Sequence, residues 1–294
     1  MAHYLFRLPD GTLAVWEIGR RKARKVFGGT YLEAFDAPPG VSIWDEIRAK
    51  TPWFEPPGAN PFARVERAPG EHYPFIARPL EGLPADHGWS PSELTAADQL
   101  ARARGQLVAL TRRLGDICQV VEPTRRNAKA YGHEVRNLLI LASTEVEAHW
   151  RIVMRANGVA KPVLTRNDYM RLAGPMGLRA YAVSFPQFPW LPAVRPFAGW
   201  KRGGKLRWYD AYNAVKHERE AHFPEATLER AILAVTAAVV MVEAQYGTHK
   251  AFEADGELRS FFRIEGRPAW PPAKVYLTPP DGVWRPVHEK SVRG

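Results

Sequence analysis

The feature that most limits the fold is an uncharged apolar run, AILAVTAAVVMV, from Ala231 to Val242. Its 12 residues fall well short of the roughly 20 that a helix needs to span a bilayer, so the run has to be buried inside protein. It lies in a segment from about Pro224 to Tyr246 that Gly247 terminates, and we expect a helix there. Such a helix can bury its apolar surface only against other elements.

Three further helices are predicted on the N-terminal side of this run. The first starts at a capping-box sequence, SPSE, and covers about Ser90–Val121, where Pro123 ends it. The second covers about Tyr131–Asn157 and has the most continuous apolar stripe, and a short third helix covers about Trp208–Arg219. We therefore expect a mainly α fold, an antiparallel bundle of about four helices with long connections rich in proline and aromatic residues.

The rest of the chain divides by composition. Residues 1–35 alternate apolar and polar side chains around an Asp-Gly pair, which predicts an N-terminal β hairpin or small meander. Residues 36–89 are rich in proline and glycine and are expected to form an irregular arm. The bundle would occupy 90–247, with a long insertion at 158–207, and 248–294 would be a C-terminal extension.

Charge and cysteine content limit the classes of partner and compartment. The chain has 41 basic and 31 acidic residues, a net charge of +10, which favours RNA or another polyanion as partner. Cys118 is the only cysteine, so an intrachain disulfide and a cysteine-based zinc cluster are excluded. The N-terminus lacks the continuous apolar core of a signal peptide. We expect a cytoplasmic protein that does not enter the membrane.

Common catalytic and cofactor motifs are missing from the sequence. There is no HExxH, no GxxxxGK[ST], no strand-linked GxGxxG and no GxSxG. His133 and His149 of the second helix are too far apart to share a metal ion. We therefore expect neither a metal nor a cofactor.

The short third helix, within WYDAYNAVKHERE, carries an unusual density of polar groups. At 100° per residue, Asp210, Asn213 and His217 fall within roughly 60° of one another, and Tyr209 and Lys216 lie beside them. One face of this helix is therefore predicted to be a polar constellation. The alternative is that these residues only orient the helix within the bundle, because buried polar groups are usually satisfied without being catalytic.

The second helix provides the residues that we expect to face this constellation. Arg136 and Glu147 lie at the margin of its apolar stripe. If the two margins meet, Glu147 would pair with Lys216 or His217, and Arg136 would pair with Asp210.

The run YNAVKH resembles the signature of the HEPN superfamily, whose members are mostly helical bundles. In that signature an arginine precedes a polar residue, often asparagine, and a histidine follows three to five residues later. Asn213 and His217 match the polar and histidine positions, whereas Tyr212 stands where the family has arginine, so Lys216 or Arg219 would have to supply the cation. The resemblance implies metal-independent RNA cleavage at a dimer cleft, in a bacterial toxin–antitoxin or phage-defence setting.

The resemblance also implies roles for the matching residues. His217 would act as general acid or base on a ribose 2′-hydroxyl or leaving oxygen, and Asn213 would position the phosphate. Arg136, Tyr209 and Tyr212 would contact the substrate. Members without activity serve as binding or dimerising modules, so a non-enzymatic interaction module, with a homodimer or another protein as partner, is the open alternative.

A basic stretch, RPFAGWKRGGKLRW, lies just before and within the third helix. Lys201, Arg202 and Lys205 would bind phosphates, and Trp200 and Trp208 would stack on bases, as suits single-stranded RNA or DNA. Its Gly-Gly pair predicts a mobile loop that closes over a substrate near the histidine. The alternative is a solvated loop that is basic without binding anything.

Overall fold

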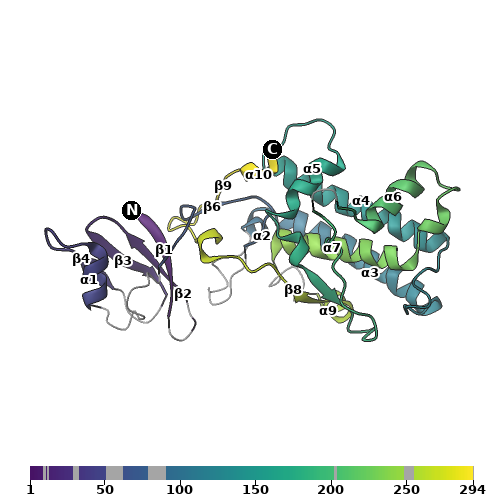
Figure 1. Ribbon diagram of the computed structural model, residues 1–294, viewed down its shortest axis with the longest axis horizontal. Helices are drawn as coiled ribbons and strands as arrows, with labels where there is room; N and C mark the ends of the chain where they lie inside the picture. The colour runs from purple at the N-terminus through teal and green to yellow at the C-terminus, as the bar shows by residue number, and fades with distance from the viewer. Residues whose placement is uncertain are drawn as a thin grey trace. The chain divides into compact units, whose positions relative to one another are not determined.

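The computed structural model describes residues 1–8, 11, 13–28, 33–50, 62–78, 91–201, 204–247 and 255–293. The chain forms two compact units (Figure 1). The first consists mainly of Met1–His72 with Ala269–Arg285, and the second of Tyr73–Ala77, Ser90–Pro268 and Pro286–Gly294. Each unit therefore combines segments that are distant in sequence.

The first unit is built on an antiparallel five-stranded sheet with the order β4-β3-β2-β1-β5. The strands are β1 (Ala2–Arg7), β2 (Leu13–Ile18), β3 (Lys22–Phe27), β4 (Ala34–Asp36) and β5 (Ala63–Arg64). A further short pair joins β6 (Glu71–His72) to β9 (Arg285–Pro286), and one 3-10 turn, η4, covers Pro272–Lys274. The expected N-terminal antiparallel element is confirmed.

The period-two pattern of the N-terminal strands gives this sheet two apolar faces. Phe6 and Trp16 point to one face, where helix α1 (Ile43–Lys50) covers them together with Phe62. Leu5 and Val15 point to the other face and pack against the C-terminal residues Val275 and Leu277. Residues 36–89, expected to be an irregular arm, thus contribute α1 and strand β5 to this unit.

The second unit is helical. Its helices are α2 (Ser92–Thr95), α3 (Ala97–Val120), α4 (His133–Ala156), α5 (Arg166–Met170), α6 (Arg207–His217), α7 (Leu228–Tyr246), α9 (Gly256–Phe261) and α10 (Lys290–Arg293). Single 3-10 turns are η1 (Arg171–Ala173), η2 (Leu178–Ala180) and η3 (Phe223–Glu225), and β7 (Ala182–Ser184) pairs with β8 (Arg263–Gly266). The four helices expected from the sequence are α3, α4, α6 and α7. Helices α4, α6 and α7 lie within four residues of their predicted bounds, whereas the first predicted helix is divided into α2 and α3, and α3 begins only at Ala97. Ser90, the expected capping residue, lies outside the described residues.

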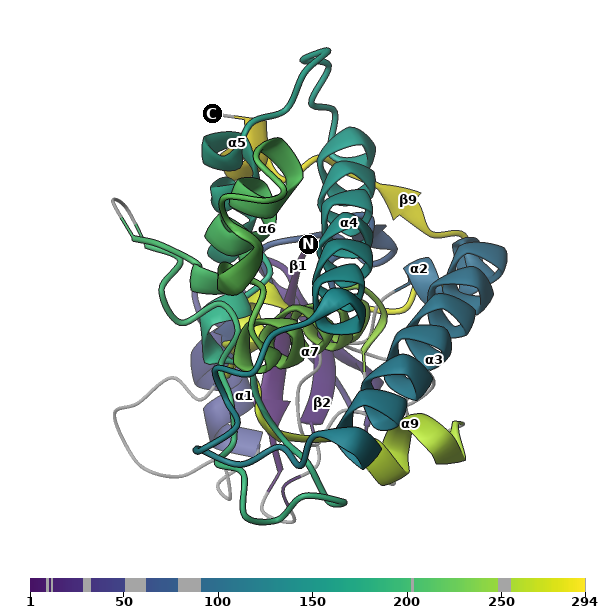
Figure 2. The same cartoon turned by 90° about the vertical axis from the view of Figure 1, so that its right-hand side faces the viewer.

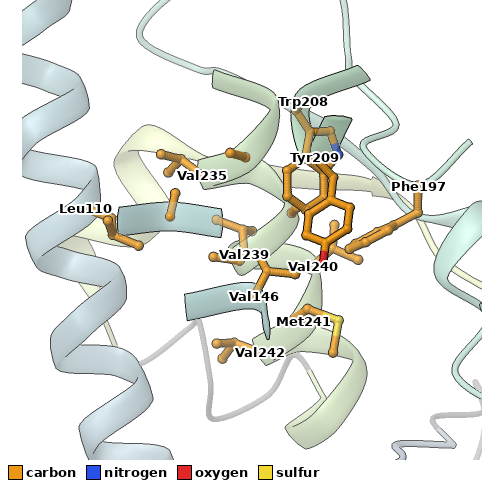
Figure 3. Close-up of a cluster of buried hydrophobic side chains, with 14 of the residues drawn as sticks. Leu110, Val146, Phe197, Trp208, Tyr209, Val235, Val239, Val240, Met241 and Val242 are labelled. Carbon is orange, nitrogen blue, oxygen red and sulfur yellow. The ribbon is translucent and has the colours of Figure 1, made fainter. Parts of the chain in front are cut away.

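Helix α7 occupies the middle of this unit and packs against α3, α4 and α6. Of its residues only Glu229, Arg230 and Leu233 are not buried. Figure 3 shows Val235, Val239 and Val240 among side chains from neighbouring elements. The expectation that the apolar run is surrounded by protein is confirmed. Over the residues that the structure describes, no helix is long and apolar enough to cross a membrane.

Asn157, fully buried at the C-terminal end of α4, joins three segments of the helical unit. Its side-chain amide donates to the backbone carbonyl of Pro74, 3.0 Å away, and its Oδ1 accepts from the backbone N–H of Glu289 at 3.1 Å. Its own carbonyl accepts a hydrogen bond from Arg293 Nε of α10 at 3.0 Å. The segment around Pro74 and the C-terminal segment of the chain are therefore attached to the same helix end.

Candidate functional site

Helix α6 lies beside α4 and against α7 (Figure 2). Its buried side carries Trp208, Tyr209 and Tyr212, which follow the 3.6-residue period toward the core. The indole of Trp150 on α4 is the centre of this contact, with ring centroids 5.2 Å from Tyr209 and 4.7 Å from Trp200. The helix is thus fixed on one side by aromatic packing.

This packing corrects one sequence-based expectation. Trp200 and Trp208 are each only 1% exposed, because both side chains fill the core around Trp150. The Trp208 indole N–H donates to the carbonyl of Pro196 at 3.0 Å. These tryptophans therefore cannot stack on nucleic-acid bases; composition alone did not distinguish core indoles from surface ones.

A polar network lies at the edge of the aromatic cluster, where α6 meets α4. The Tyr209 hydroxyl donates to Glu147 Oε1 at 2.7 Å, and the Tyr212 hydroxyl donates to Oε2 at 3.4 Å. The Lys216 ammonium in turn donates to the Tyr212 hydroxyl at 2.9 Å. Glu147 and Lys216 are thus connected through a phenol, where a direct ion pair was expected.

The network changes the acid–base properties of its members. Burial, reinforced by the hydrogen bond to Glu147, raises the pKa of the Tyr209 phenol, so Tyr209 stays protonated. The hydrogen bond to Tyr212 raises the pKa of Lys216, so its positive charge is retained. The Tyr212 hydroxyl therefore lies between the Glu147 carboxylate and the Lys216 ammonium.

The rest of the polar sector is partly used within the protein. Asp210 forms an ion pair with Arg166 of α5, Nη1 to Oδ1 at 3.0 Å, so the expected pairing of Asp210 with Arg136 is wrong. The Asn213 side-chain amide donates to the Tyr209 carbonyl of its own helix at 3.0 Å, and the residue remains half-buried.

The outer end of α6 carries the exposed groups. Lys216 and His217 occupy its last turn, Arg219 follows it, and all three are exposed. Arg151 of α4 is also exposed and close enough to act electrostatically on Lys216. The C-terminal end of α6 therefore presents two cations and an imidazole to solvent.

Arg136 of α4, which was expected to contact the substrate, lies beside Phe223 and not among the exposed groups of α6. It is 6% exposed, its guanidinium carbon is 5.4 Å from the Phe223 ring centroid, and its Nη2 donates to Asn137 at 2.9 Å. Because the side chain is buried behind Phe223, Arg136 does not reach the surface of α6.

The basic stretch before α6 is only partly within the described residues. Lys201 and Lys205 are exposed, whereas Arg202 and the first residue of the Gly-Gly pair lie outside the described residues. Gly204 is attached to the helical unit, since Arg166 Nη2 donates to its carbonyl at 2.8 Å. A Cβ on Gly204 would lie 1.9 Å from the Gly199 carbonyl oxygen, so this position requires glycine.

Sequence reasoning missed Arg166 and the aromatic support of α6. Arg166 comes from the long connection between the second and third predicted helices, and its contact with Asp210 spans 44 positions of sequence. A helical-wheel projection places side chains on one helix only, so it gave no signal for such a contact.

The comparisons with known proteins give no relative for this chain. No family model, no curated protein and no solved structure matches it. The function therefore has to be inferred from the site itself.

Proposed function

We propose that the helical unit is an RNA-binding protein of HEPN-like type, with α3, α4, α6 and α7 as its antiparallel bundle, that cleaves RNA without a metal. The observation that supports this most is the outer end of α6, where Lys216, His217 and Arg219 are exposed on a helix whose other side is fixed in the core. Cations bind phosphate oxygens, and an imidazole is suited to acid–base catalysis near neutral pH.

The proposed division of roles follows the contacts. Lys216 is held by Tyr212 and retains ammonium protons for a phosphate, so it supplies the cation that the motif position lacks. His217 exchanges a proton with the ribose 2′-hydroxyl or the leaving oxygen. Asn213 positions the phosphate, because its side-chain amide has two N–H groups and only one of them is needed for the hydrogen bond to the Tyr209 carbonyl.

Replacement of the histidine tests the chemistry. His217→Ala is expected to abolish RNA cleavage while leaving the free energy of unfolding within about 0.5 kcal/mol of wild type, because the side chain is exposed. Cleavage of a labelled RNA in the presence of a chelator and denaturant unfolding of the same samples are the measurements. Loss of cleavage that accompanies unfolding, or cleavage that survives the substitution, would refute His217 as the catalytic group.

Replacement of lysines tests binding. Lys205→Ala and Lys216→Ala should each weaken RNA binding and lower the slope of log affinity against log salt by about 1. Lys22→Ala and Lys50→Ala, at exposed lysines of the first unit, are the matched controls and should leave the slope unchanged. Equal effects of both pairs would mean that net charge, and not this surface, determines binding.

A second candidate function is a non-enzymatic interaction module, and one observation favours it. The network of Glu147, Tyr209, Tyr212 and Lys216 connects α4 to α6 without any ligand. In that case His217→Ala would change neither RNA cleavage nor stability, and no cleavage by the wild-type protein would be measured.

A further inference from the structure

A hollow of the helical unit lies between the C-terminal end of α3 and the N-terminal end of α4. Its volume is about 490 Å³. Tyr131, 53% exposed, and His133 line it on the α4 side, and Val120, 86% exposed, lines it on the α3 side. Exposed apolar side chains that are scattered singly are ordinary, but ones that gather in a hollow are typical of a binding site, so this hollow with an accessible aromatic ring is suited to a flat ligand.

The aromatic side of the hollow is held rigidly from behind. The Phe223 ring packs edge-on against Tyr131 at 5.6 Å and lies 5.0 Å from the His133 ring. Arg136, buried, stacks its guanidinium on the same Phe223 ring at 5.4 Å. Arg136 is therefore a positioning residue for a preformed ring platform, which we define as Tyr131, His133 and Phe223.

The charges at the hollow favour a base over a phosphate. Asp116 and Glu134 line it, and the cation that lines it is Arg113. Carboxylates repel phosphate but accept hydrogen bonds from the amino and imino N–H groups of nucleobases. An aromatic platform with carboxylates beside it is therefore complementary to the flat face and polar edge of a base.

The platform is continuous with the surface proposed above to bind RNA. Phe223 begins η3, which follows α6 after a short turn and packs on it. One short segment of chain, from His217 to Phe223, thus connects the end of α6 to the ring platform. An RNA strand bound by its phosphates at α6 would have this hollow within the same unit.

We propose that this hollow takes one unpaired nucleobase of the bound RNA, stacked on the platform, with Asp116 or Glu134 accepting from its N–H edge. This inference rests on the proposed RNA binding. It assigns single-stranded RNA as the substrate class, because a paired base cannot leave its stack without an energetic cost.

The experiment compares single-stranded RNA with inorganic polyphosphate, which offers phosphates and no bases. Tyr131→Ala is expected to weaken RNA binding about tenfold and to leave polyphosphate binding unchanged, because only stacking is lost. Tyr131→Phe retains the ring and should bind RNA within about twofold of wild type. Photo-cross-linking of 4-thiouridine RNA to the unaltered protein, expected at Tyr131 or His133, needs no variant and so does not depend on its folding.

The outcomes separate the two proposals. If the wild-type protein binds both ligands and Tyr131→Ala changes both equally or neither, or if the cross-links lie away from the platform, the base site is overturned and RNA binding stands. If the wild-type protein binds neither ligand, the proposed function fails and the base site fails with it.

Discussion

Helices α6 and α7 pack against each other and against the same helix, α4, yet they meet solvent very differently. In α7 the residues from Ala234 to Tyr246 are all buried, whereas α6 buries one side and exposes Lys216 and His217. A helix enclosed on every side can be changed only at the cost of the core. A helix with one free side can carry binding groups whose replacement leaves stability nearly unchanged, and the surface proposed to bind RNA lies on such a helix.

The largest effect should come from breaking α7. Val239 is fully buried in the core shown in Figure 3, so Val239→Asp places an unpaired carboxylate among hydrocarbon groups and should lower the free energy of unfolding by at least about 4 kcal/mol. Urea unfolding followed by circular dichroism measures it. A loss below about 1 kcal/mol, the range of surface changes, would mean that α7 is not enclosed as described.

The second prediction concerns a buried polar contact near the end of α7, between His149 of α4 and Gln245 of α7. His149 Nδ1 lies 2.9 Å from Gln245 Oε1, Glu145 lies 3.4 Å from Nε2, and burial lowers the pKa of His149 to about 4. In the unfolded chain His149 becomes protonated near pH 6.5, whereas in the folded protein it becomes protonated only near pH 4. Stability contributed by the neutral ring is therefore present above about pH 6.5 and is lost as the pH falls, by about 3 kcal/mol in total.

Urea unfolding at a series of pH values from about 7 to 4 measures this loss. The control is His149→Asn, which keeps a polar group at this position but does not titrate, so its stability should fall less over the same range. Parallel pH profiles for the two proteins would show that His149 is protonated equally in the folded and unfolded chains.

The third and smallest effect on stability is expected where Glu147 of α4 contacts the buried side of α6. Glu147→Ala removes the acceptor of the Tyr209 and Tyr212 hydroxyls and should cost about 2 kcal/mol, whereas Glu147→Gln keeps an acceptor and should cost about 1 kcal/mol or less. Thermal unfolding of both variants checks the order. An equal cost for both would indicate that Glu147 acts by packing and not as an acceptor.

The helices were predictable from the sequence because their signals are local. The apolar stripe before Gly158 gave α4, observed as His133–Ala156, and the apolar run before Gly247 gave α7, observed as Leu228–Tyr246. Helix α1 was missed because it lies in a segment dense in proline and glycine, where the periodicity is short.

The site was only partly predictable. The sector of Asp210, Asn213 and His217 follows from the helical period, and in the structure each of these three residues is at least partly exposed. The partner of Asp210 comes from a distant segment, so a helical-wheel projection of α6 could not show that Asp210 forms an ion pair with Arg166. The tryptophans near the basic stretch were misassigned because an indole suits a core as well as a stacked base.

The attachment of two distant segments to Asn157, residues 73–77 and 286–294, has a consequence for how the chain can be divided. Both segments belong to the helical unit, as their hydrogen bonds to Asn157 show. In the sequence, however, residues of the first unit separate each of them from Ser90–Pro268. A single proteolytic nick therefore cannot release either unit as an intact piece. A fragment spanning only Ser90 to Pro268 would leave the buried amide of Asn157 without its partners at Pro74 and Glu289, so a fragment of the helical unit has to include residues 73–77 and 286–294 as well.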